Sequence, residues 1–295
     1  MHPSTSSENA GELGDYVKPP WEELQIEPYR LVVDADEEVF YLYTQVDDCV
    51  DDRDHAVTNG LGYVDASSDR IILDLGVEGQ TLGILQNTTS LRTTKGDTGS
   101  IVWRASIMLA RAMYERKIFT DLSFFSWARV LELGAGTGAF SLAMSKLGVI
   151  TPAQASMWLC TDQEAVLPLL AKNLKGNSLR SSALDWNDFS SGHGTTRWSR
   201  ETSQRQLLKD LGGWPDLIVC TDCVYNPGLF QALVSTLLML TKPGKTSVLM
   251  ACELRSSDIM SDFLSVWMRS DDSWKIVSLE GRLMKTHALW LGWRV

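Results

Sequence analysis

The stretch from Val130 to Gly138 reads VLELGAGTG and decides the fold class of this chain. A short apolar run of strand type leads directly into glycines at every second position. Gly134 permits a tight turn, Gly136 lets the backbone approach a ligand closely, and Gly138 permits close packing at the start of a helix. The stretch therefore predicts a strand, a turn and a helix, with a ligand site at the carboxyl end of the strand.

The same order of strand and helix repeats from residue 102 to the C-terminus. Apolar runs of strand type alternate with segments whose apolar residues recur at helical spacing. These runs lie at residues 157–161, 217–220, 247–252, 274–279 and 288–294. The repetition predicts an α/β, Rossmann-like fold: a mostly parallel sheet with helices on both faces. The polar segment Asn187–Asp210 interrupts the pattern, and we expect it to be a surface insertion.

The residues before position 102 have a different character. Residues 1–20 are polar and rich in Ser, Gly and Pro, which predicts a disordered tail. Residues 21–101 contain short β-prone segments separated by Gly, Asp and Asn, which predicts a β-rich extension ahead of the Rossmann-like domain at 102–295. The segments expected to be strands are Val39–Val46, Arg70–Leu75 and Thr81–Gln86.

Acidic residues follow two of the predicted strands. Asp162 ends the second strand, and an acid about 20 residues beyond such glycines can accept hydrogen bonds from ribose hydroxyls. Asp185 and Trp186 stand at the next strand end, where an acid and an aromatic ring could bracket adenine. The structural alternatives are a helix cap for Asp162 and a core position for Trp186.

The sequence TDCVY at residues 221–225 places a carboxylate and a phenol after a further strand. Asp222 and Tyr225 would face a substrate at the reactive end of a bound nucleoside cofactor, with Thr221 beside it. A helix cap and a packed tyrosine are the alternative interpretation. Trp103, in TGSIVW, either covers the cofactor or anchors the extension to the sheet.

The glycines alone leave the ligand open. With Ala139 the stretch also satisfies the dinucleotide pattern G-x-G-x-x-A, so an NAD-dependent oxidoreductase is a competing prediction. A catalytically silent module that binds the cofactor and a partner is a third alternative.

Composition narrows the choice of partner. The net charge of −10 disfavours direct nucleic-acid binding and suits a basic protein segment, although it also serves solubility. Five cysteines at irregular spacing, with one isolated CxxC at Cys220 and Cys223, predict reduced thiols and no metal site. No run of about 18 apolar residues is present, so we expect no membrane partner. We expect the protein in the cytoplasm, with the nucleus as a second location.

Taken together, the segments TGSIVW, VLELGAGTG, CTDQE, ALDW and TDCVY, in that order, resemble the seven-β-strand protein-lysine methyltransferases of methyltransferase family 16. The resemblance runs from about Thr81 to the C-terminus. Within the family, ALDW, CVYN and ELRSSD look most like the fungal ribosomal lysine methyltransferase 5 branch, which modifies a large-subunit ribosomal protein.

The resemblance implies S-adenosylmethionine as cofactor and a lysine on a ribosomal or ribosome-associated protein as acceptor. Asp222 and Tyr225 match the D-x-x-Y motif on the substrate side. The cofactor-binding positions that it implies are Trp103, Gly134, Ala135, Gly136, Asp162, Trp186 and Thr221. Thr221 stands where relatives often have a small apolar residue, which suits a contact through the backbone.

Overall fold

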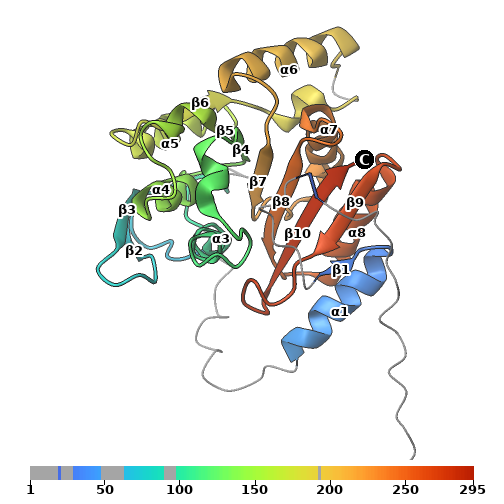
Figure 1. Ribbon diagram of the computed structural model, residues 1–295, viewed down its shortest axis with the longest axis horizontal. Helices are drawn as coiled ribbons and strands as arrows, with labels where there is room; N and C mark the ends of the chain where they lie inside the picture. The colour runs from blue at the N-terminus through green and yellow to red at the C-terminus, as the bar shows by residue number, and fades with distance from the viewer. Residues whose placement is uncertain (1–18, 21–28, 48–62, 90–97, 192–193) are drawn as a thin grey trace, which may run out of the picture.

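A central sheet of eight strands organises the molecule (Figure 1). The structure is a computed structural model that describes residues 19–20, 29–47, 63–89, 98–191 and 194–295. The strand order across the sheet is β1-β9-β10-β8-β7-β4-β5-β6. The strands span β1 Arg30–Leu31, β4 Val130–Leu133, β5 Trp158–Asp162, β6 Arg180–Ala183, β7 Leu217–Thr221, β8 Ser247–Glu253, β9 Trp274–Ser278 and β10 His287–Arg294.

Strands β4 to β8 are parallel, and the order in which the chain places them creates a site. From β4 the chain moves outward through β5 to β6, then returns to place β7 on the other side of β4. Ligands bind at such a reversal, outside the carboxyl ends of the strands. β10 lies antiparallel between β8 and β9. This topology confirms the predicted Rossmann-like class.

Helices cover both faces of the sheet, because successive strand residues point to opposite sides. On β4, Val130 belongs to one core cluster and Leu131 to the other. The first face packs against α3 (Arg104–Tyr114), α4 (Ala139–Lys146) and α5 (Leu167–Leu174). The second packs against α1 (Ala35–Asp47), α6 (Arg197–Leu211), α7 (Phe230–Leu240) and α8 (Ser257–Arg269). Strands buried on both faces explain the continuous apolar runs of the sequence.

The described part of the N-terminal region joins this sheet at two places. β1 extends the sheet beyond β9, and Trp290 on β10 donates a hydrogen bond to the buried Glu38 on α1 at 3.0 Å. β2 (Arg70–Asp74) and β3 (Thr81–Leu85) form a separate antiparallel hairpin, as predicted. The division at residues 20 and 101 stays a prediction.

The strand predicted at Val39–Val46 is wrong, because this segment belongs to the helix α1. Asp34 caps the helix by accepting a hydrogen bond from the backbone N–H of Glu37 at 2.9 Å. Val39 and Leu42 are buried while Phe40 is exposed, which is the one-sided burial of a helix. The β-branched and aromatic residues suggested a strand, and the packing of one helical face against the sheet overrides that preference.

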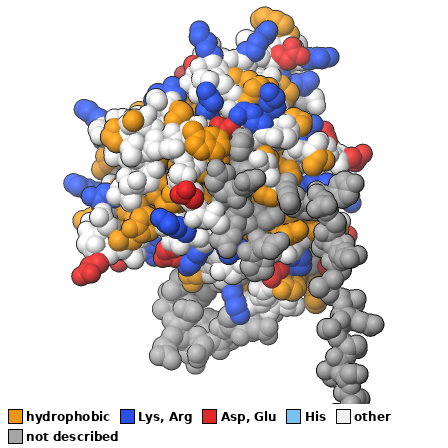
Figure 2. Space-filling model, in the orientation of Figure 1, with side chains coloured by type: hydrophobic (Ala, Val, Ile, Leu, Met, Phe, Trp, Pro, Cys, Tyr) orange, Lys and Arg blue, Asp and Glu red, His pale blue; other side chains and the backbone are white. Residues whose placement is uncertain are grey.

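The surface insertion predicted at Asn187–Asp210 is also wrong, because its second half is the crossover helix α6 between β6 and β7. Thr196 and Ser199 form a capping box at its start, and Gly212 ends it in the left-handed conformation. Leu207 and Leu211 are its buried residues. The rest of α6 is mostly polar, apart from the exposed Trp198 and from Leu208, and Figure 2 shows Lys and Arg side chains over this part of the surface.

Parts of two predicted segments, the N-terminal tail and the polar segment at 187–210, lie outside the described residues. The predicted tail at 1–20 lies outside the described residues except for positions 19 and 20, and residues 192–193 of the polar segment also lie outside them. Among the described helices, none has the length and hydropathy that crossing a membrane requires. The four described cysteines are buried and free.

Candidate active site

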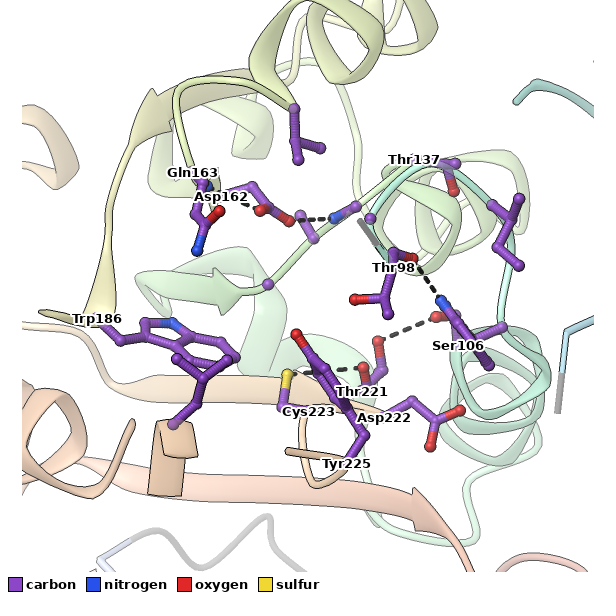
Figure 3. Close-up of a pocket in the computed structure, with 18 of the residues that line it drawn as sticks. Thr98, Ser106, Thr137, Asp162, Gln163, Trp186, Thr221, Asp222, Cys223 and Tyr225 are labelled. Atoms are coloured by element: carbon purple, nitrogen blue, oxygen red, sulfur yellow. Dashed lines mark hydrogen bonds between the residues drawn. The ribbon is translucent and has the colours of Figure 1, made fainter. Parts of the chain in front are cut away.

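A pocket lies at the carboxyl ends of β4, β5 and β7, where the strand order reverses (Figure 3). All nine residues to which the resemblance assigned a cofactor or substrate role line it. They are Trp103, Gly134, Ala135, Gly136, Asp162, Trp186, Thr221, Asp222 and Tyr225. They come from five different segments, and the parallel strands bring most of them to one edge because their carboxyl ends coincide.

The glycine turn after β4 forms the floor of the pocket. Gly134 and Gly136 have φ angles of +64° and +54°, which side chains rarely adopt. A Cβ on Gly136 would lie 3.1 Å from the carbonyl oxygen of Gly99. Gly136 therefore lies close to the segment before α3, while the close approach to a ligand stays a prediction. Gly138 packs closely against α5, as expected, because a Cβ there would lie 2.9 Å from Leu170 Cδ1.

Asp162 holds the glycine turn in place. Its Oδ2 accepts a hydrogen bond from the backbone N–H of Gly136 at 2.7 Å, and its Oδ1 accepts one from Gln163 at 2.7 Å. The N-cap of α5 is Val166, so the helix-cap alternative for Asp162 is not what the structure has. The carboxylate lies half-buried at the pocket wall.

Trp186 opens a 3₁₀ turn, η4 (Trp186–Phe189), and lines the pocket. A Cβ on Gly134 would lie 3.2 Å from the Trp186 ring, so this ring packs against the glycine turn. Asp185 instead accepts hydrogen bonds from Asn187 N at 2.9 Å and Nδ2 at 3.0 Å. Asp185 is thus the cap of η4. Of the two residues predicted to bracket adenine, only Trp186 lines the pocket.

Thr221 and Trp103 connect the pocket to α3. Thr221 Oγ1 lies 3.0 Å from Ser106 Oγ, with the hydroxyl of Thr221 buried. Trp103 Nε1 donates to the carbonyl oxygen of Thr98 at 2.8 Å, and its ring meets Tyr63 edge-on with centroids 6.3 Å apart. Trp103 therefore lines the pocket and also contacts the N-terminal region, and its role toward the cofactor stays a prediction.

Asp222 has the most constrained backbone of the site. Its φ is +59°, a left-handed conformation that is uncommon for residues other than glycine, although Asp and Asn adopt it more readily than the rest. Its Oδ1 accepts from the backbone N–H of Glu253 at 3.1 Å, and its Oδ2 accepts from Arg255 Nη2 at 2.7 Å. Burial raises the pKa of Asp222, and the charge of Arg255 opposes that rise. Tyr225 stands half-exposed beside it on the pocket wall.

Glu253 and Arg255 are site residues that the sequence analysis did not single out. β8 pairs with β7 so that Thr221 lies opposite Ala251, which brings the residues after β8 beside Asp222. Arg255 contacts Glu253 Oε2 at 3.3 Å, and its guanidinium carbon lies 4.8 Å from the centre of the Trp103 ring. The signal was the ELR triplet directly after a parallel strand, which is the same rule that located Asp162 and Asp222.

His287, at the start of β10, borders this group of charges. Burial lowers its pKa to about 4, and the positive charges of Arg255 and Arg104 add to the shift. Burial also raises the pKa of Glu253, against the opposing effect of Arg255. Two cations and two carboxylates therefore lie together beside the half of the pocket that holds Asp222.

Comparison with known proteins agrees with this geometry. A family model described as lysine methyltransferase matches residues 84–269, which include every site residue above except Tyr63 and His287. Among curated proteins, the chain is 31% identical over 158 residues to protein N-lysine methyltransferase METTL21A of Danio rerio, covering 53% of this chain and 61% of that protein. It is 28% identical over 152 residues to protein-lysine N-methyltransferase EFM6 of Saccharomyces cerevisiae, covering 48% and 58%.

A third relative carries a different name. The chain is 26% identical over 206 residues to a diaminohydroxyphosphoribosylamino-pyrimidine deaminase of Schizosaccharomyces pombe, covering 69% of this chain and 45% of that protein. The chain therefore spans 45% to 61% of the length of these three relatives. Among solved structures, the CurJ carbon methyltransferase aligns at a TM-score of 0.34 and 18% identity, over 56% of this chain and 48% of that one. That similarity is too low to support an argument, so the fold assignment rests on the strand order.

Proposed function

This chain belongs to the lysine methyltransferase family, and from that premise we propose that it transfers a methyl group to a lysine of another protein. The cofactor of this family is S-adenosylmethionine. The observation that carries the proposal is the single pocket that joins the glycine turn and Asp162 at one side to Asp222 and Tyr225 at the other. Family membership also favours methyl transfer over the NAD-dependent alternative.

The chemistry of the pocket walls suits that cofactor. The carboxylate of Asp162 is an acceptor for ribose hydroxyls, and the ring of Trp186 offers a flat apolar surface to adenine. Gly134 and Gly136 have no side chains to obstruct an amino-acid moiety, and a Cβ at Gly134 would meet Cys223 and Trp186. We assign these residues, with Ala135, Gly136 and Thr221, to the cofactor.

Asp222 and Tyr225 would receive the acceptor lysine, with Trp103, which we also assign to the cofactor, at the boundary between the two. Bound S-adenosylmethionine supplies a methyl group on a sulfonium, which the lysine Nζ takes up as the C–S bond breaks and its electron pair stays on sulfur. The contribution of the residues is alignment, which is worth roughly 7–11 kcal/mol of the barrier when two reactants are held in line. The net charge of −10 supports a basic substrate.

The lysine must lose a proton before it attacks. Free lysine, with a pKa of about 10.4, is less than about 0.1% neutral at pH 7. The aromatic surroundings of Trp103 and Tyr225 favour the neutral amine by excluding water, whereas the carboxylate of Asp222 favours the ammonium. We therefore assign Asp222 to docking and orientation, and the proton to water.

The finer identity of the substrate is a further part of the proposal. The motifs ALDW, CVYN and ELRSSD support a large-subunit ribosomal protein as the target, reached in the cytoplasm or the nucleus. The domain at 102–295 would hold the catalytic machinery, with the region before it contributing Tyr63 beside Trp103.

The test is methyl transfer from radiolabelled S-adenosylmethionine to proteins of a lysate and to purified ribosomal subunits, followed by mass spectrometry of the labelled band. We expect the label on a lysine of a basic protein. Binding of the cofactor without any transfer would instead identify a silent binding module. Thermal protection by NAD, and none by S-adenosylmethionine, would support the oxidoreductase alternative.

A further inference from the structure

Three side chains surround the guanidinium of Arg255 and form what we call the cation cage: Trp103, Asp222 and Glu253. The guanidinium lies over the face of Trp103 at 4.8 Å, with Asp222 Oδ2 at 2.7 Å and Glu253 Oε2 at 3.3 Å. An aromatic face with two carboxylates at its rim is the arrangement that binds an organic cation. Two members of the cage, Trp103 and Asp222, also line the pocket, where the cofactor and the acceptor lysine would meet.

The partners of this ion pair differ in how deeply they are held. The side chain of Asp222 is 2% exposed, and two hydrogen bonds fix it on a constrained backbone. The side chain of Arg255 is 26% exposed and lies between the end of β8 and the start of α8. Arg255 can therefore turn into solvent on a long side chain, whereas Asp222 has no comparable freedom. We therefore treat the carboxylate of Asp222 as fixed in place and the guanidinium of Arg255 as the group that another cation can displace.

We propose that the cation cage is the seat of the acceptor lysine's ammonium group, and that Arg255 is an internal competitor for that seat. The inference rests on the proposed function. An incoming lysine exchanges one cation for another, so the buried charge of Asp222 stays compensated while the substrate docks. A free amine in solution gains too little from this exchange to displace a tethered guanidinium, whereas a protein substrate docked elsewhere on the surface gains more. Arg255 thus restricts transfer to lysines presented by a bound protein.

The competing role for Arg255 is to position Asp222 for catalysis. The two roles give opposite results when the side chain is removed. A competitor leaves behind a cage that binds small cations, and those cations then inhibit transfer. A positioning group leaves behind a misplaced Asp222, and an added guanidinium restores transfer by taking the missing place.

The binding experiment measures butylammonium, which mimics the lysine side chain, by calorimetry on the full chain. We expect Arg255→Ala to bind it about tenfold or more tighter than the wild type, the order of one partly desolvated cation–π contact. Replacing Trp103 by Leu in the Arg255→Ala background should abolish the gain. Arg255→Gln is measured in parallel in case the alanine variant does not fold, and Arg269→Ala, at the exposed far end of α8, is the matched control. Equal butylammonium affinity in folded Arg255 variants and the wild type overturns the inference.

The kinetic experiment uses the unmethylated form of the protein that the labelling experiment identifies as the target. Transfer is measured with millimolar guanidinium, and with sodium chloride at the same ionic strength as reference. We expect guanidinium to inhibit Arg255→Ala competitively with the protein substrate and to leave the wild type unaffected. Restored transfer in that variant would overturn the inference and make Arg255 a positioning residue. A wild type that methylates no lysine contradicts the proposed function instead, and the butylammonium experiment then still decides whether the cage prefers cations.

Discussion

Asp162 and Gly136 are joined by a 2.7 Å hydrogen bond between a carboxylate oxygen and a backbone N–H, across 26 residues of sequence. The carboxylate at the end of β5 thereby fixes the conformation of the glycine turn after β4. The same side chain is the proposed acceptor for the ribose. One residue consequently serves both the folding of the turn and the binding of the cofactor.

Asp162→Ala is therefore expected to weaken S-adenosylmethionine binding by roughly 1.5–3 kcal/mol, the range for a hydrogen bond to a charged group. The melting temperature should fall as well, because the N–H of Gly136 loses its partner. Calorimetry and thermal unfolding measure the two effects. Asp162→Asn retains an acceptor oxygen for Gly136 and should recover more of the stability than of the affinity. Unchanged affinity in both variants would remove Asp162 from the cofactor site.

Gly136→Ala tests the close approach to Gly99. The substitution places a Cβ in a left-handed conformation, which costs about 1–2 kcal/mol of unfolding free energy, and 3.1 Å from a carbonyl oxygen. Gly148→Ala is the matched control, because Gly148 has a φ of +78° and nothing within 4 Å of its added Cβ. We expect both variants to lose stability in denaturant titrations and only Gly136→Ala to lose cofactor affinity. Equal cofactor affinity in the two variants would mean that the turn does not shape the site.

Glu132, inside the VLELGAGTG stretch, predicts a pH dependence of stability. The side chain is buried on β4, where Ser141 donates a hydrogen bond to it and Trp158 donates to Ser141 at 2.6 Å. Burial raises the pKa of Glu132 to about 7 from an ordinary 4.5. The folded protein therefore binds this proton more tightly than the unfolded chain. Its contribution to the free energy of unfolding falls as the pH rises from about 4.5 to about 7, at up to about 1.4 kcal/mol per pH unit.

Glu132→Gln should remove this dependence, since the amide keeps an acceptor for Ser141 and carries no charge. We expect the variant to gain stability relative to the wild type as the pH rises through that window, measured by urea titration. His287 acts with the opposite sign, because its lowered pKa of about 4 makes stability rise with pH between about 4 and 6.5. The difference between variant and wild type cancels that effect. Glu164→Gln, which removes an exposed carboxylate, is the control and should leave the pH dependence of the free energy of unfolding unchanged.

Asp222→Asn separates docking of the substrate from binding of the cofactor. Asn tolerates a φ of +59° better than Ala does, so this variant avoids added backbone strain. We expect kcat/KM for the protein substrate to fall roughly 10- to 150-fold, equivalent to about 1.5–3 kcal/mol for a hydrogen bond to a charged group. Cofactor affinity should change little, because an interaction with the substrate amine is absent from the cofactor complex. Transfer at the wild-type rate would leave Asp222 with a structural role only.

Tyr225→Phe tests whether the phenol or the ring matters. The ring lines the pocket beside Asp222, so removal of the hydroxyl alone keeps the apolar wall. We expect a smaller loss of kcat/KM than in Asp222→Asn, and Tyr225→Ala should lose more than Tyr225→Phe. A loss in Tyr225→Phe as large as in Tyr225→Ala would assign the hydroxyl itself to the reaction.

The amino-acid sequence by itself determined the parallel sheet and the edge at which the site lies. Apolar runs of strand length alternate with helical periodicity after residue 102, and this local pattern survives in any tertiary context. Because parallel strands end at one edge, the residues that follow them must meet there, as Asp162, Trp186 and Asp222 do. Such inferences succeed where the local sequence around a single strand end is enough to locate a residue.

Only the tertiary structure decided what depends on neighbours distant in the chain. Val39–Val46 fits either a strand or a helix until one face packs against the sheet. The helix α6 was missed because it has few buried apolar residues among many polar ones. The contacts of Asp222 with Arg255 depend on β7 lying beside β8, which no local pattern contains. Side-chain partners are set by which strands adjoin, and that order is a property of the whole packed sheet.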